Sequence, residues 1–200
     1  MNYTSDIVFT PAVKKFQEQF KSRNSYARME QFGGWNSKVS SDLEGFLKDM
    51  DSFYFGSANA DGQPYIQHRG GKKGFLKVVD NETLAFADFS GNKQYISIGN
   101  LSENNKATIF LMHYVSQTRI KIWGTAYVDT DESLIASLRD ENYNAKIERA
   151  IVFKVKAWDV NCKQHIKQRF AADEIKKITE PLESKIKTLE TTIDHLKSNN

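Results

Sequence analysis

The chain has 200 residues, of which 40% are hydrophobic, 12% aromatic and 26% charged, a composition typical of a globular protein that can bury a core. Its 28 basic and 25 acidic side chains leave a net charge of +3, too small and too mixed in sign to indicate a nucleic-acid partner. No stretch reaches transmembrane length and the N-terminus does not resemble a signal peptide, so we expect no membrane association. The single cysteine excludes an internal disulfide and favours a cytoplasmic location.

Residues 1–50 are expected to form helices that pack on the domain that follows. Thr10 and Pro11 are typical of an N-cap and a first helical position, and they precede apolar residues at helical spacing. Ser41 and Glu44 have the spacing of a capping box at the start of a second apolar stripe. The sequence therefore predicts two helices in this segment.

The middle of the chain, residues 51–170, alternates short apolar runs with turn signals. Three hairpins and one further strand are predicted from residues 53–59, 64–69, 74–79, 83–88, 106–114, 118–128 and 149–158, with a helical insert at 131–138. This pattern favours an antiparallel barrel or sandwich over a parallel doubly wound sheet. No glycine-rich dinucleotide or phosphate-loop motif follows a strand.

The last segment, residues 171–200, has a different periodicity. Apolar residues recur in steps of three and four, at Ile175, Ile178, Leu182, Ile186, Leu189, Ile193 and Leu196. This spacing predicts an amphipathic helix of coiled-coil type, with a stutter around Leu182 and Ile186. Pro181 either begins a new helix or kinks this one. The helix either packs on its own domain as a surface helix or associates with a second copy.

The stretch "WDVNCKQHIKQRF" contains Cys162 and His165, which raises the question of a thiol nucleophile or a metal site. Catalytic cysteine–histidine pairs are usually adjacent in space and not in sequence. Structural zinc needs four good ligands, and the other histidines are scattered. We therefore expect neither thiol chemistry nor a bound metal here.

A stronger candidate is "FADFSGNKQYIS", in which a predicted strand ends at Asp88. The turn Ser90-Gly91-Asn92 follows, and a short helix is expected to begin near Lys93. Small residues let a backbone approach a ligand closely, and helix-start amides with a lysine offer positive potential to a phosphate. An ordinary helix cap would explain the same residues.

Further candidates lie on other predicted strands. In "PYIQHRGGKKGF", a solvated loop competes with a second anion contact, in which Gln67 and His68 would also hydrogen-bond the edge of a bound ring. Arg119 starts one strand, where it could equally be a surface ion-pair partner. Trp158 ends another strand, where a core role competes with stacking on a cofactor.

Taken in order, four stretches resemble the pyridoxamine 5′-phosphate oxidase-like family of FMN-binding split barrels, and most of all its oxidase-related branch. They are "DSFYFGSANADGQPYIQHRGG", "LAFADFSGNKQYISIGNLSENNKATIFLMHY", "RIKIWGTAYV" and "WDVNCKQHIKQRF". The resemblance implies a mainly β fold, a six-stranded antiparallel Greek-key split barrel, flanked here by N-terminal helices and a C-terminal coiled-coil-like helix. It also implies a homodimer with FMN in clefts at the interface.

The resemblance also assigns roles around the phosphate. Lys93 falls where the family places a phosphate-binding lysine, whereas Asn92 replaces the neighbouring arginine, which removes that second contact. Either Arg69 or His68 would supply the contact from the strand.

Other roles concern the flavin ring. Arg119 falls where a glutamine commonly meets the ring, and a cation there would favour negative charge on the reduced flavin. Trp158 and Arg169 match a tryptophan and an arginine that flank the cofactor, which makes Cys162 a bystander.

These roles favour an FMN-dependent oxidoreductase acting on an unknown small molecule, with a nicotinamide as one possible electron donor; no catalytic residue is identified. The substrate-holding Arg-x-His pair of the vitamin-making oxidase falls on His165 and Lys167, so a true pyridoxamine 5′-phosphate oxidase is not expected. One alternative is a flavin-binding carrier or sensor without turnover. Another is a haem-handling split barrel with His165 or His195 as the iron ligand.

Overall fold

The structure, a computed structural model, describes residues 3–161 and 163–198. The chain forms two compact units, one built from Met1–His113 and Arg119–Cys162 and the other from Tyr114–Thr118 and Lys163–Asn200. Among the described residues, no helix combines the length and the apolar character needed to cross a membrane.

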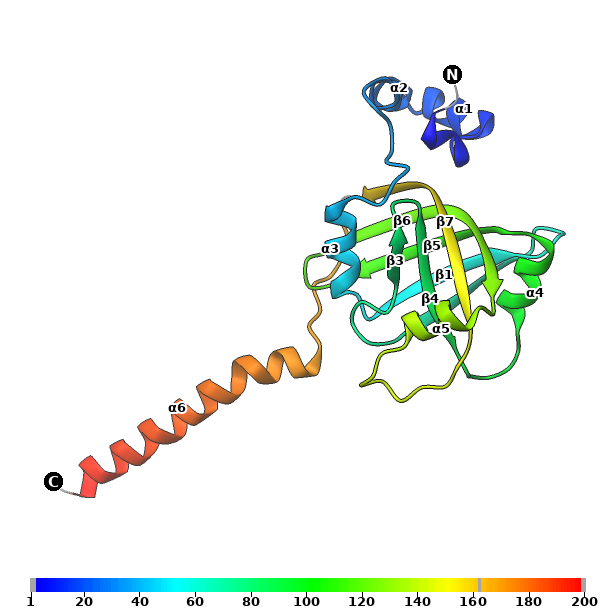
Figure 1. The fold of residues 1–200 in the computed structure, drawn as a ribbon. Coiled ribbons are helices and arrows are strands. Elements are labelled where there is room, and N and C mark those ends of the chain that lie inside the picture. The colour runs from blue at the N-terminus through cyan, green and yellow to red at the C-terminus, as the bar shows by residue number, and fades with distance from the viewer. Residues whose placement is uncertain (1–2, 162, 199–200) are drawn as a thin grey trace. The chain divides into compact units, whose positions relative to one another are not determined.

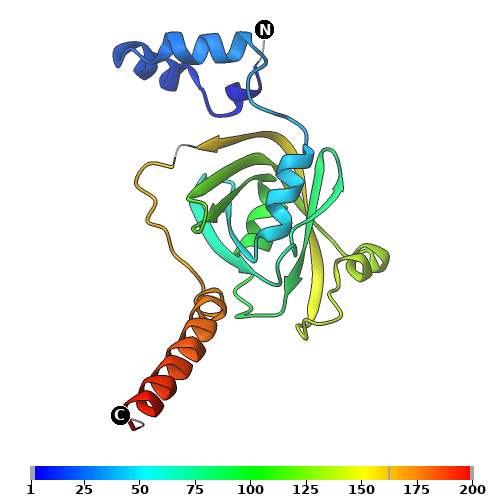
Figure 2. The same cartoon turned by 90° about the vertical axis from the view of Figure 1, so that its left-hand side faces the viewer.

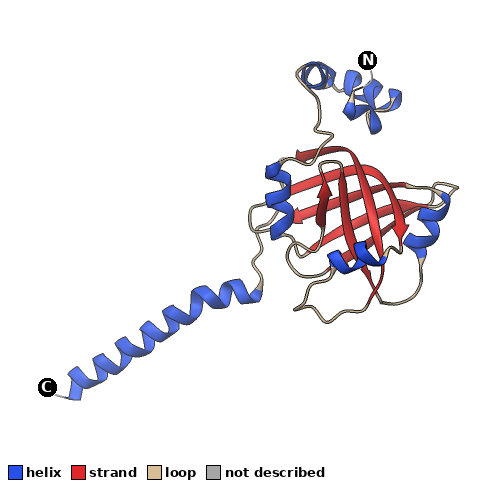
Figure 3. Cartoon of the chain, viewed as in Figure 1, coloured by secondary structure: helices blue, strands red, loops and turns tan. Residues whose placement is uncertain are grey.

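A seven-stranded, mainly antiparallel sheet forms the larger unit, with its strands in the order β2-β1-β5-β6-β7-β4-β3 (Figures 1 and 3). The strands are β1 (Ser52–Ala58), β2 (Pro64–Gly70), β3 (Lys77–Asp80), β4 (Thr83–Phe89), β5 (Lys106–His113), β6 (Thr118–Asp129) and β7 (Ile147–Asn161). Figure 2 shows the strands curling into a barrel. The split-barrel expectation is confirmed, but the implied count of six strands was wrong. The three hairpins and the further strand predicted from the sequence add up to seven, because turn residues and alternating strands are local signals that can be found without an alignment to the family.

Aromatic side chains fill the barrel. Phe53, Phe55, Phe86 and Phe153 are fully buried, and Phe86 makes edge contacts with both Phe53 and Phe55 at centroid distances of 5.0 and 5.7 Å. This geometry is favoured by the quadrupole of each ring beyond the area that it buries. Because inward residues alternate with outward ones along each strand, the opposite faces of β2 and β6 remain available for polar groups.

The helices of the larger unit are η1 (Thr4–Ile7), α1 (Pro11–Gln19), α2 (Arg23–Gln31), α3 (Ser41–Asp49), α4 (Ile96–Glu103) and α5 (Glu132–Leu138). Helix α3 contributes Leu43 and Leu47 to the barrel core. Its N-cap is Ser40, whose hydroxyl accepts a hydrogen bond from the Leu43 N–H at 3.3 Å, one residue earlier than the capping-box spacing predicted.

The N-terminal segment has its own polar centre. Thr10 caps α1 as predicted, whereas α2 was not predicted. Glu30 of α2 is buried, ion-paired with Arg23 and hydrogen-bonded by Ser5. Burial alone would raise the pKa of Glu30, but these hydrogen bonds outweigh it and lower the pKa.

The smaller unit begins with polar contacts between the β5–β6 turn and the segment that follows β7. The Gln117 side-chain amide donates to the Ile166 carbonyl at 2.5 Å, and that of Gln168 donates to the Val115 carbonyl at 2.7 Å. Helix α6 (Ala172–Ser198) then continues without interruption through Pro181, which neither ends it nor starts a new helix.

The β6–β7 register shifts between Trp123 and Gly124, and the close packing at Gly124 provides a test of the barrel packing. A Cβ at Gly124 would lie 2.0 Å from the Lys154 carbonyl oxygen and 2.8 Å from the Phe153 ring, so neither β7 nor the core can accept it. We expect Gly124→Ala to lower the free energy of unfolding by about 3 kcal/mol or more, the upper end of overpacking costs. Gly45→Ala is the control, because Gly45 lies within α3 with open space around it and should gain about 0.5–1 kcal/mol. Urea titration of both variants measures this, and equal effects would contradict the packing described.

Candidate functional site

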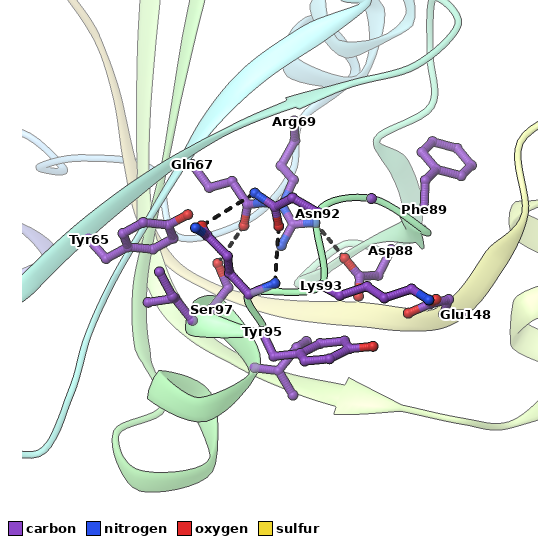
Figure 4. Close-up of a pocket in the computed structure, with 14 residues that line it drawn as sticks. Tyr65, Gln67, Arg69, Asp88, Phe89, Asn92, Lys93, Tyr95, Ser97 and Glu148 are labelled. Carbon is purple, nitrogen blue, oxygen red and sulfur yellow. Dashed lines mark hydrogen bonds and ion pairs between the residues drawn. The ribbon is translucent and has the colours of Figure 1, made fainter.

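A pocket lies beside the outer end of β4, bounded by β2, the loop after β4 and the start of α4 (Figure 4). Its cavity volume is about 170 Å³. The lining includes Tyr65, Gln67, Arg69, Asp88, Phe89, Gly91, Asn92, Lys93, Tyr95, Ser97 and Glu148. The residues that line the pocket are far apart in the sequence. They come mainly from the edge strand β2, the loop after β4 and the N-terminus of α4.

The alternation of β2 determines which of its residues reach the pocket. Tyr65, Gln67 and Arg69 share the face that lines it, as expected for every second residue of a strand. His68 lies on the other face, against the ring of Tyr54 at a centroid distance of 5.7 Å. Of the two candidates for a strand-borne anion contact, Arg69 lines the pocket and His68 does not.

A cluster of charged side chains forms one wall. Arg69 Nη1 donates to Asp88 Oδ1 at 2.5 Å, and Arg149 Nη1 lies 3.5 Å from Asp88 Oδ2. The side chains of Arg69 and Asp88 are only 11% and 10% exposed, and Arg69 Nε is buried with no hydrogen-bond partner in the described part of the chain. Asp88 thus lies between two guanidinium groups and partly neutralises both.

The net charge around the pocket is small. Arg149 also pairs with Glu148 at 2.7 Å, and its guanidinium lies over the Tyr95 ring at 5.4 Å. Three cations, Arg69, Arg149 and Lys93, face the two carboxylates of Asp88 and Glu148. The excess of one positive charge gives moderate attraction for an anion, and Lys93 has no partner among the ion pairs of the described residues.

The loop between β4 and α4 has an unusual backbone. Lys93 and Tyr95 both have left-handed conformations, with φ of 58° and 55°. Asn92 Oδ1 accepts a hydrogen bond from the Gln94 N–H at 3.2 Å. Left-handed non-glycine residues cost roughly 1–3 kcal/mol each and cluster at functional sites.

The helix expected near Lys93 begins three residues later, at Ile96, because the left-handed residues prevent an earlier start. Ser97 in its first turn donates to Gln67 Oε1 at 2.8 Å, which joins α4 to β2 (Figure 4). The first amides of α4 therefore border the pocket, where the positive end of the helix dipole favours an anion.

Five of the ten predicted site residues line this pocket: Gln67, Arg69, Gly91, Asn92 and Lys93. Ser90 belongs to the same loop, where its N–H donates to the Lys146 carbonyl at 2.8 Å. His68 faces away, and Arg119, Trp158 and Arg169 lie outside the lining.

Trp158 is part of the barrel core. It is 6% exposed, and its indole N–H donates to the Lys38 carbonyl at 2.8 Å. Its backbone N–H donates to the Asn36 carbonyl at 2.8 Å, in an isolated β-bridge. Of the two roles considered for this residue, core packing accounts for all of these contacts.

Arg119 lies on the outer face of β6, together with Lys121 and Trp123. The Lys121 ammonium lies over the Trp123 ring at 5.2 Å, and Trp35 stacks on the same ring at 4.8 Å. The pKa of Lys121 is lowered, chiefly by burial and also by the charge of Arg119; the negative charge of Asp159 opposes this shift without reversing it. Burial also raises the pKa of Asp159, which lies opposite Lys121 in the β6–β7 register.

The last predicted site residue belongs to the other unit, and the cysteine that was set aside lies outside the described residues. Arg169 is in the smaller unit, with its guanidinium 4.8 Å over the Tyr114 ring. Cys162 is outside the described residues. Across residues 3–161 and 163–198, no group of three or more His, Cys, Asp or Glu side chains could hold a metal ion.

Comparison with known proteins identifies the fold and the family. A family model for pyridoxamine 5′-phosphate oxidase matches residues 39–163, which covers the whole barrel. The chain belongs to this family.

Solved structures of HupZ show the same fold at low identity. HupZ of Group A Streptococcus is 12% identical, covers 66% of this chain and 99% of its own, and has a TM-score of 0.51. A histidine-to-alanine variant of HupZ is 13% identical over 62% of this chain and 99% of its own, with a TM-score of 0.50. A Clostridium acetobutylicum protein related to general stress protein 26 is 14% identical over 67% and 94%, with a TM-score of 0.47. No curated protein matched the sequence.

Several residues of the site in this family member were missed. Tyr65 could have been found, since it precedes Gln67 and Arg69 at strand spacing. Glu148 and Arg149 could not, because only the pairing of β4 with β7, which sets Asp88 opposite Arg149, brings them to the pocket. Sequence carries no local signal for that register.

The ion-pair cluster predicts unequal costs for its members. Asp88→Asn leaves two guanidinium groups without their shared carboxylate, so we expect it to destabilise the fold by about 3 kcal/mol, the lower end for breaking a buried pair. Arg69→Met should cost less, because Arg149 still faces Asp88. Lys48→Ala is the control: it breaks the exposed pair with Glu44 and should cost less than about 1 kcal/mol. Denaturant unfolding measures all three, and equal losses for Asp88→Asn and Lys48→Ala would contradict the burial of this cluster.

Proposed function

We propose that this chain binds FMN and acts as a flavin-dependent oxidoreductase on an unidentified small molecule. The observation that carries the proposal is the convergence of Lys93, Arg69 and the first amides of α4 on one pocket of a pyridoxamine 5′-phosphate oxidase family fold. Each of these groups favours a phosphate. The family membership adds that flavin is the cofactor class to expect.

The donors of the pocket fit a phosphate better than a neutral group. Lys93 offers a charged donor without an ion-pair partner in the described chain, and the buried Nε of Arg69 offers a hydrogen that nothing in that chain accepts. Asp88 reduces the attraction that Arg69 alone would exert. Asn92, in place of the usual arginine, leaves the phosphate with fewer charged contacts, so we expect binding weaker than a double-cation site would give.

The size of the cavity supports a shared site. Pockets for small molecules usually enclose about 300–1,000 Å³, whereas this cavity measures about 170 Å³. One chain therefore encloses only part of a flavin, and we propose that a second copy completes the site in a homodimer, as is common in the family. Arg119, which lies outside the pocket of its own chain on the half-buried outer face of β6, would then serve the flavin held by the other chain.

The residues of this chain would bind and orient the cofactor. Bound FMN supplies hydride or electron transfer, with a nicotinamide as one possible donor. Gln67, held by Ser97, is positioned to hydrogen-bond a ring edge, and Tyr65 offers an aromatic surface beside it. A cation such as Arg119 near the N1–C2=O edge would favour negative charge on the reduced ring.

The visible spectrum of the purified protein, with the released cofactor identified by mass, tests the proposal. Flavin absorption and a released mass of FMN are the expected results. A Soret band in place of flavin absorption would instead support the haem-handling alternative. Reduction of the bound flavin by NADH or NADPH and its reoxidation separate an oxidoreductase from a carrier or sensor.

A substitution in the loop tests the phosphate contact. Lys93→Ala should weaken FMN by about 1.5–3 kcal/mol, the range for a hydrogen bond to a charged group, and should change riboflavin affinity little, because riboflavin has no phosphate. Lys73→Ala is the control, since Lys73 lies outside the pocket lining. Fluorescence titration with both flavins measures the effect. Equal affinity of the unsubstituted protein for FMN and riboflavin would remove the basis of the assignment.

The substrate of the vitamin-making oxidase is not expected to be turned over. His165 and Lys167 stand where that enzyme has its Arg-x-His pair, so a planar bidentate guanidinium is replaced by an imidazole and an imidazole by a flexible ammonium. We therefore expect negligible oxidation of pyridoxine or pyridoxamine 5′-phosphate by the FMN-loaded protein. Steady-state oxygen consumption measures this, and turnover at about 1 per second or faster would place the chain among the true oxidases.

A further inference from the structure

Helix α6 carries an apolar stripe that no described residue of its own compact unit covers. The helix has no buried residues, and every apolar side chain of the stripe is between 42% and 60% exposed. The stripe consists of Ile175, Ile178, Leu182, Ile186, Leu189, Ile193 and Leu196. A stripe of this length on one helix indicates a missing partner.

We propose that this stripe is buried against α6 of a second copy, in a parallel, two-stranded coiled coil. The inference goes beyond the flavin site and does not depend on it. The charge of the helix argues against a membrane surface: Ala172–Ser198 holds five lysines and six acidic residues, whereas helices on anionic membranes have a basic polar face.

The identity of the residues along the stripe favours two strands. From Ile186 onward the spacing is that of a heptad, with Ile186 and Ile193 at the a positions and Leu189 and Leu196 at the d positions. Isoleucine at a with leucine at d is the combination that favours parallel dimers over trimers and tetramers. The first part of the stripe, from Ile175 to Ile186, spans one 11-residue repeat, which locally unwinds the supercoil without breaking the apolar face.

The order of the steps favours a parallel arrangement. Along the chain the apolar residues are separated by three, four, four, three, four and three positions, which is not the same sequence when reversed. In a parallel pair in register, each residue meets its own copy. In an antiparallel pair with full overlap, Leu182 would meet Leu189 but Ile186 would face Lys185, which would place a charge in the seam.

The charges beside the seam agree with this orientation. In the heptad frame Lys185 occupies a g position and Glu190 the following e position, the two positions that meet between strands of a parallel dimer. By symmetry the pair forms twice. The next g position is Thr192, so Lys197 at the following e position meets no like charge.

Site-directed cross-linking of the full chain tests the pairing. In a Cys162→Ser background, Leu189→Cys should form a disulfide-linked dimer under mild oxidation, because position 189 faces its own copy across the seam. Thr191→Cys is the matched control. Position 191 is an outer f position, so this variant should form at least several-fold less disulfide-linked dimer than Leu189→Cys. Equal cross-linking of the two variants, or none by Leu189→Cys, would overturn the coiled coil. The readout requires no flavin, so it stands apart from failure of the proposed function.

Two further arms test the orientation. Mixing a Leu182→Cys chain with a differently tagged Leu189→Cys chain should yield few mixed dimers, since these positions meet only in an antiparallel pair; mixed dimers in excess of the Leu189→Cys homodimer would overturn the parallel arrangement. Lys185→Glu should lower the fraction of Leu189→Cys dimer, and Lys185→Glu with Glu190→Lys should restore it. A double variant no better than the single one would also count against the parallel register.

Discussion

The pocket depends on a carboxylate shared by two guanidinium groups. Asp88 lies near the end of β4, opposite Arg149 on the neighbouring strand β7, whereas Arg69 comes from β2, which pairs with neither of them. The cluster therefore joins β2 to strands that lie far from it in the order of the sheet. Without Asp88, two cations would face each other at low exposure, a costly arrangement. The same cluster holds Arg69 against the pocket and orients Arg149 over Tyr95. These ion pairs therefore determine both the shape of the pocket wall and its charge.

The pairing of Arg69 and Arg149 with Asp88 would also limit how strongly the pocket could bind the proposed phosphate. A guanidinium already paired with a carboxylate has less to offer a phosphate than a free one. The rest of the attraction for a phosphate would come from the strained loop. Two left-handed residues and the Ser97–Gln67 hydrogen bond hold Lys93 and the first amides of α4 beside the cavity. Affinity for the proposed phosphate would therefore rest on a precise loop conformation more than on accumulated charge.

Local signals predicted most of the barrel. Turn residues and alternating apolar positions indicate hairpins, which is why all seven strands were predicted. Local residue patterns also predicted the Thr10 cap and pointed to Lys93 and Arg69 as site candidates. Long-range register has no such signal: nothing in the sequence places Arg149 opposite Asp88. Backbone conformation is similarly hidden, since Lys93 and Tyr95 are ordinary helix residues by propensity yet delay α4 by three positions. Trp158 matched a cofactor position by resemblance; in the structure it belongs to the barrel core, and its indole N–H donates to the Lys38 carbonyl.

Pro181 gives the tail a property that its apolar stripe alone would not. Inside a helix a proline removes the hydrogen bond to the carbonyl four residues earlier, here that of Lys177, and costs about 3 kcal/mol. Within its own unit the helix buries no residue, so no packing there offsets this cost, and in the proposed coiled coil its helical content would rise and fall with the concentration of the protein. Folding of the tail would then be coupled to dimerisation, and the tail would become helical only where the protein is concentrated enough to pair.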